Sequence, residues 1–272
     1  MKKIILFVLT MFLLISLTSC GVHKKVKGSK LDKEAAEILA DEIRVAYDER
    51  KDEPFKGWIS IDQETTITER EKDGSYEITK MKVTGKVFES SDLEKIKAVI
   101  EYKETIKTYD VETTIKSVSV ETKKLIHING QSFIKTKTKH TVSSNYGKSK
   151  ETEVEREMTN AEKISIPVVG STVSIENSIL DDFLLHILTV LNYQDCFKKG
   201  NTIYYENSGE IKKNIIAVSL DKNLQAKKVT LYKEENRVDN TFIRQVISKT
   251  IIKKSTGRIV IKPIISKYEY DD

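Results

Sequence analysis

Cys20 is the residue whose type and position most clearly indicate a chemical modification. Residues 1–17 begin with two lysines and continue as an apolar stretch, and three residues then stand directly before the cysteine: Leu17, Thr18 and Ser19. A basic start, a short apolar region and small residues before a cleavage point are typical of a bacterial export signal. A cysteine thiolate is the nucleophile that forms a thioether with diacylglycerol. The spacing therefore predicts removal of residues 1–19 and lipid attachment at Cys20.

The tetrapeptide Leu17-Thr18-Ser19-Cys20 resembles the lipobox of bacterial lipoproteins at all four positions. The resemblance implies a lipid-anchored location at the cell membrane, on its extracytoplasmic face. The apolar stretch of about 14 residues is shorter than the ~20 that span a bilayer, which favours a cleaved signal over a retained anchor. An ordinary secretory signal, with Cys20 left as a free thiol, is the alternative. Residues 20–30 carry four lysines and are predicted to form the tether, so the membrane is the first predicted partner.

The composition excludes several classes of function. The formal net charge of +5 falls to about +3 once Lys2 and Lys3 are removed, and both signs are spread along the chain. Such a balance does not indicate a nucleic-acid partner. Cys196 is the second of two cysteines and has no partner if Cys20 carries lipid, so no structural disulfide is expected. An isolated cysteine of this kind is usually a small buried apolar residue.

Residues with catalytic or metal-binding chemistry are few and scattered. The four histidines are His23, His127, His140 and His186, and none has a second histidine or cysteine at ligand spacing. Serine-nucleophile and phosphate-loop motifs are absent from the sequence. Asp181 and Asp182 are adjacent, so on a helix they do not face each other, and acids in a first helical turn favour the helix dipole. The sequence therefore predicts a protein that is not an enzyme and that has no metal or cofactor.

Two amphipathic helices are expected. The first covers residues 31–47, whose apolar residues recur at steps of three and four, and it ends near residues 52–54. The second begins after Asn177 and has the most apolar stripe after the signal. That stripe consists of Ile179, Leu180, Phe183, Leu184, Ile187, Leu188 and Leu191.

The rest of the chain alternates apolar and polar residues with the period of β-strands. About six strands are expected between residues 59 and 158, with a hairpin at Asn129-Gly130 and a bulge near Lys80. About five more are expected between residues 203 and 264. The predicted fold class is α+β, a strongly curved antiparallel sheet, or half-barrel, covered by the N-terminal helix and the central apolar helix.

This order of elements resembles the LolA-like lipoprotein-carrier superfamily over roughly residues 31–263. The resemblance rests on the element order, the hairpin at Asn129-Gly130 and the strand pair around Asp221, without a side-chain motif. It implies a cavity for acyl chains between sheet and helices. Residues 31–272 are predicted to form one domain, with a subdomain split near residues 163–172 left open.

Two functions remain from these observations. The first is a membrane-anchored lipoprotein that binds a lipid or apolar ligand, lined by the seven residues of the central stripe. The second is a surface-tethered partner-binding or structural module of the envelope without a small ligand. The sequence identifies neither the ligand nor a protein partner.

Overall fold

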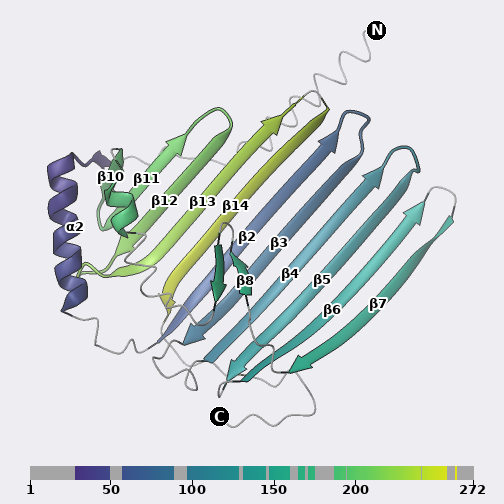
Figure 1. Cartoon of the computed structure of the whole chain (residues 1–272), viewed down its shortest axis with the longest axis horizontal. Helices are drawn as coiled ribbons and strands as arrows, with labels where there is room; N and C mark the ends of the chain where they lie inside the picture. Colours follow the sequence, from purple (N-terminus) through teal and green to yellow (C-terminus); the bar gives the residue numbers. More distant parts are fainter. Residues whose placement is uncertain are drawn as a thin grey trace, which may run out of the picture.

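The computed structural model describes residues 28–49, 57–88, 97–128, 131–144, 147–159, 165–168, 171–174, 187–193, 195–239, 241–255 and 261. Most of these residues lie in long antiparallel strands, and helix α2 (Lys33–Asp48) lies beside one end of the sheet (Figure 1). The strands of the main sheet are β1 (Ser29–Lys30), β2 (Trp58–Glu71), β3 (Tyr76–Phe88), β4 (Lys97–Asp110), β5 (Ile115–Ile128), β6 (Gln131–Ser144), β7 (Gly147–Thr159), β10 (Cys196–Lys199), β11 (Thr202–Ser208), β12 (Lys212–Leu220), β13 (Ala226–Val238) and β14 (Phe242–Ser255). A separate hairpin pairs β8 (Ser165–Val168) with β9 (Ser171–Ser174).

The two blocks of strands form one continuous sheet. Its order is β1-β10-β11-β12-β13-β14-β2-β3-β4-β5-β6-β7, and it is open at β1 and β7. The blocks meet where β14 pairs with β2 over their full length, from Phe242 opposite Glu71 to Ser255 opposite Trp58. The described strands before and after residues 163–172 therefore do not form two separate sheets.

Helix α2 forms where its periodicity predicts. The Asp32 carboxylate caps it by accepting a hydrogen bond from the Ala35 N–H at 2.8 Å. One stripe of the helix is buried, namely Ala36, Leu39, Ala40 and Ile43. This stripe joins a core cluster with residues from β2–β5 and β10–β14, so the helix is fixed by apolar packing against the sheet.

The predicted fold class, a half-barrel covered by two helices, is wrong. The described helical residues are α2 and a short segment at residues 187–191, while the main sheet has 12 strands. A helix of 16 residues is about 24 Å long, whereas strands spaced at ~4.8 Å make such a sheet about 50 Å wide. One helix of this length cannot cover it. No described helix is long and apolar enough to cross a membrane.

The hairpin at Asn129-Gly130 is confirmed by its flanking strands, because Ile128 pairs with Gln131. The bulge near Lys80 is wrong. β3 pairs without a register shift on both sides, and the shifts in the main sheet lie between Ser219 and Leu220 and between Val142 and Ser144.

Candidate functional site

The main sheet has two unlike faces, which alternate side chains of each strand occupy. The core face carries Ile61, Val83, Ile100 and Val229 of the core cluster. The outer face carries ion pairs such as Lys82–Glu64 and Lys124–Glu101. On the core face, the core cluster occupies the strand halves that lie towards α2. Val246 and Ile67 continue the apolar surface beyond it on β14 and β2. The opposite halves of β12–β14 and β2 carry charge.

Glu235 is the centre of this charged region. Its side chain is only 7% exposed, and three cations approach it. The Arg237 Nε donates to its Oε1 at 2.6 Å, while Nζ of Lys233 and Nζ of Lys212 lie 3.4 and 3.9 Å from Oε2. Burial alone would raise the pKa of this carboxyl, but hydrogen bonds from Arg237 and Lys233 and the charge of Lys212 outweigh it and lower the pKa. Glu235 is therefore a fixed anion that orders three cations.

A second arginine stands directly opposite the first. Arg237 on β13 pairs in register with Arg244 on β14, and Arg244 Nε donates to Glu69 Oε1 at 2.8 Å. Opposed residues on one face have Cβ atoms about 5 Å apart, and like charges so placed repel each other. Among the described residues, no further hydrogen bond or ion pair of either guanidinium is found. Both Nη groups therefore remain available for binding.

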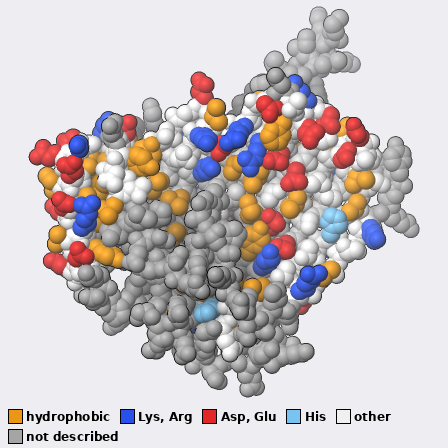
Figure 2. Space-filling view, viewed as in Figure 1, with side chains coloured by type: hydrophobic (Ala, Val, Ile, Leu, Met, Phe, Trp, Pro, Cys, Tyr) orange, Lys and Arg blue, Asp and Glu red, His pale blue; other side chains and the backbone are white. Residues whose placement is uncertain are grey.

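We call Lys212, Lys233, Arg237 and Arg244 the cation cluster. It faces two compensating carboxylates, Glu235 and Glu69, and Glu77 lies beyond it, opposite Glu69. Figure 2 shows this face, with Lys and Arg side chains gathered near the upper ends of β12–β14 and acidic side chains to one side. Two guanidinium groups held in place by carboxylates can clamp phosphate, sulfate or carboxylate oxygens bidentately.

The cluster does not suit acid–base or metal chemistry. A guanidinium does not lose its proton in proteins, and the neighbouring Glu235 carboxyl has a lowered pKa. Within the described part of the chain, no group of three histidine, cysteine or acidic side chains could hold a metal ion. The arrangement can bind and orient an anion.

The predicted ligand-lining residues lie elsewhere, as far as the structure describes them. Ile187 and Leu191 are buried in the core cluster, and Leu188 packs against its margin. These three side chains fill the core beside Val190 and Cys196. The other four predicted residues, Ile179, Leu180, Phe183 and Leu184, lie outside the described residues. So do Leu17, Thr18, Ser19 and Cys20, whose predicted cleavage and lipidation remain predictions.

Sequence reasoning missed the cation cluster. It followed alternating apolar residues, whereas the last part of β13, up to Val238, alternates in charge. The pattern Lys233-x-Glu235-x-Arg237 has the period of a strand and places all three charges on one face. A search for alternating charge would have found the β13 part of the cluster, but not its pairing with Arg244 and Lys212.

No family model and no curated protein matches the chain. Among solved structures, the translocator domain of the autotransporter NalP from Neisseria meningitidis is similar, with a TM-score of 0.36 and 9% identity, covering 80% of this chain and 99% of that one. Ail, the attachment invasion locus protein of Yersinia pestis, has a TM-score of 0.21 and 12% identity, covering 74% and 100%. Both neighbours are outer-membrane β-barrel proteins.

The described fold corrects two predictions. The assignment to a lipoprotein domain that resembles the LolA-like carriers is wrong, because the described residues form a 12-stranded sheet without the two covering helices. The predicted function, a lipid-binding lipoprotein or a tethered envelope module, is set aside with it, because the described residues of the predicted cavity lining are packed in the core. Of the predicted location, the lipid anchor at Cys20 lies outside the described residues, so it remains a prediction.

Proposed function

We propose that the chain is a noncatalytic binding protein for a polyanion that carries phosphate or sulfate groups. The observation that supports it is the opposed pair Arg237 and Arg244, each held through Nε by a carboxylate, with Nη groups that no described residue binds. Fixing a guanidinium before the ligand arrives reduces the ordering cost of binding. Lys212 and Lys233 add charge on the same face.

The cluster is accessible as well as ordered. The side chains of Arg237, Lys212 and Lys233 are 61%, 54% and 44% exposed. An incoming oxyanion would meet four cations, which are ion-paired with Glu235 and Glu69. Because like charges face each other across β13 and β14, a bound anion also relieves their repulsion.

The test measures binding of inorganic polyphosphate and of dextran sulfate to the full chain at about 0.15 M salt, where exposed charges are screened beyond ~8 Å. The double variant Arg237→Gln/Arg244→Gln is expected to lose about tenfold or more in affinity, since a hydrogen bond to a charged group contributes about 1.5–3 kcal/mol. The two polymers distinguish phosphate from sulfate recognition.

The matched control is Lys82→Gln/Lys124→Gln. It removes the same charge from two ion pairs on the outer face. If the control weakens binding as much as the arginine variant, binding follows net charge and the assigned site is wrong. Failure of the native chain to bind either polymer would overturn the proposed function itself.

A further inference from the structure

Helix α2 has a second stripe that the sheet does not cover. Ile38 and Val45 are 55% and 58% exposed, although both are large apolar residues. They are seven positions apart, so they lie on one side of the helix about two turns from each other. Asp41 and Glu42 stand between them, and Ala46 and Glu49 follow. This stripe mixes apolar and acidic side chains, unlike the buried stripe of Ala36, Leu39, Ala40 and Ile43.

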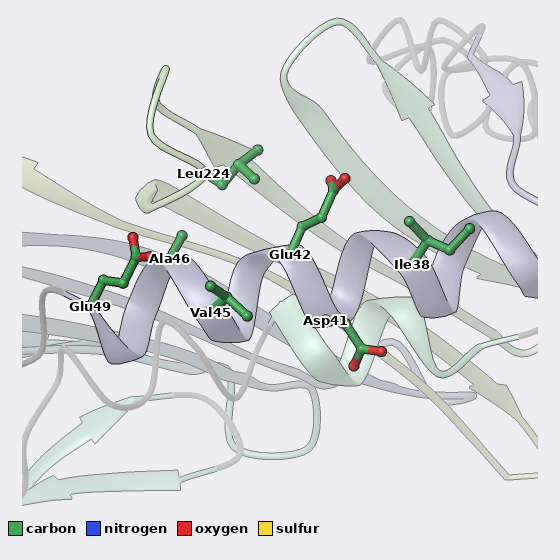
Figure 3. Close-up of a pocket in the computed structure, with 7 residues that line it drawn as sticks. All are labelled: Ile38, Asp41, Glu42, Val45, Ala46, Glu49 and Leu224. Atoms are coloured by element: carbon green, nitrogen blue, oxygen red, sulfur yellow. The ribbon is translucent and has the colours of Figure 1, made fainter.

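A groove of about 550 Å³ lies along this second stripe. Its far wall is Leu224, in the turn between β12 and β13, and Figure 3 shows Leu224 on the side of the helix to which Ala46 and Glu42 point. Leu224 adopts a left-handed backbone conformation with φ of +60°, which is uncommon for leucine. The Asp221 carboxylate holds the turn by accepting from the N–H groups of Asn223 and Gln225 at 2.8 and 3.0 Å.

The charge at the groove is acidic. Asp41 is paired with Arg44 at 2.8 Å. Glu42 and Glu49 have no ion pair or hydrogen bond of their side chains among the described residues. An occupant must therefore offer apolar side chains to Ile38, Val45 and Leu224 and cations to the two free carboxylates.

We propose that this groove docks a basic amphipathic helix of a protein partner. Two apolar side chains seven residues apart on such a helix match the spacing of Ile38 and Val45, and flanking lysines reach Glu42 and Glu49. Charge complementarity excludes an anionic lipid surface as the preferred occupant. The site is separate from the cation cluster, which lies at the other end of β12 and β13.

The test uses a synthetic helical peptide of leucine and lysine in amphipathic order, and the same peptide with glutamate in place of lysine. Fluorescence anisotropy with the full chain is expected to show binding of the lysine peptide only. Val45→Lys should weaken it at least tenfold, and Glu42→Gln/Glu49→Gln several-fold. Both changes are at exposed positions, where substitutions leave the fold intact.

Val238→Lys is the matched control, because Val238 is 73% exposed and lies at the far end of β13. It should bind the lysine peptide as the native chain does. Equal weakening by Val238→Lys and Val45→Lys, or binding of both peptides, would overturn the proposal. If sedimentation instead shows a dimer that Val45→Lys dissociates, the groove belongs to a second copy of the chain and the partner helix is wrong.

Discussion

The two ends of the sheet are held together by different forces. Near α2, side chains such as Ile43, Ile203 and Val218 are buried to within 1% of full burial. At the β6–β7 edge, three ion pairs on the outer face join the strands: Lys135–Glu155 at 2.5 Å, Lys137–Glu153 at 2.6 Å and Lys139–Glu151 at 2.7 Å. Apolar burial stabilises strongly, whereas an exposed ion pair contributes little. We therefore expect the α2 end to contribute most of the free energy of unfolding. The ion pairs at the β7 edge should specify how β6 and β7 pair and should add little to that free energy.

The charges at the edge have another use. β7 has 13 residues and, among the described strands, pairs only with β6. An unpaired strand edge is a template for association with other chains. Its exposed side chains include Glu151, Glu153, Glu155 and Arg156. Charged side chains on an edge strand oppose unwanted pairing. The charges of these ion pairs therefore oppose pairing of β7 with strands of other chains.

The largest expected effect comes from Ile43→Ala in α2. This residue is 1% exposed and sits in the core cluster, so its truncation should cost about 2–5 kcal/mol of unfolding free energy. Urea unfolding measures it. The matched change at the other end, Val154→Ala on β7, should stay within about 0.5 kcal/mol because Val154 is 50% exposed. Equal losses at the two positions would contradict the comparison.

Glu235→Gln should give the next effect, a lower urea midpoint at neutral pH but a smaller loss than Ile43→Ala. The carboxylate balances three cations, and its pKa is lowered in the folded chain. A lowered folded-state pKa means stability that is present above the unfolded pKa, about 4.3, and lost as pH falls through the folded value. The difference between native chain and variant should therefore shrink from pH 6 to pH 3.

The control for this pH series is Glu206→Gln, which removes a carboxylate paired with Lys213 on the outer face. Glu206→Gln should lower the stability to urea less than Glu235→Gln does at every pH. If Glu235→Gln lowers the stability to urea by the same amount from pH 6 to pH 3, the carboxylate contributes through its shape and not through its charge.

Gln63→Met should stabilise the fold by about 1 kcal/mol. Gln63 is 2% exposed, its Oε1 has no hydrogen-bond partner, and its Nε2 reaches Thr65 only at 3.4 Å. A buried acceptor left unpaired costs about 1–3 kcal/mol, and methionine has a similar shape without it. Gln245→Met, at a half-buried position, is the control and should be neutral. A net loss for Gln63→Met would show that a water molecule satisfies Oε1.

The sequence predicted the apolar regions of the fold better than the charged ones. Apolar periodicity located α2 and the strands of the core, because burial imposes a pattern on residue type. The helix was expected to end near residues 52–54 but ends at Asp48, since little apolar contact marks its last turn. The change of face near Lys80 was interpreted as a bulge. The regular pairing of β3 shows instead that the apolar residues move from one face to the other along a straight strand.

The cation cluster and the helix groove could not be predicted in the same way. Both depend on which strand lies beside which, and the pairing of β14 with β2 joins residues about 180 positions apart, such as Arg244 and Glu69. Leu224 reaches the groove only because its turn adopts a left-handed conformation. The order of strands in the sheet decides which residue pairs with a charged side chain. A periodic pattern in the sequence does not reveal that order.

The smallest expected effect, at the β6–β7 edge, is the sharpest test of the comparison. A double-mutant cycle with Lys139→Gln and Glu151→Gln should give a coupling of about 0.2–1 kcal/mol, because both side chains are about half exposed. In 1 M NaCl the Debye length falls to ~3 Å and the coupling should vanish. A larger coupling that survives salt would mean that the three pairs act as one network. The β7 edge would then contribute to stability as the core does, and the contrast between the two ends would fail.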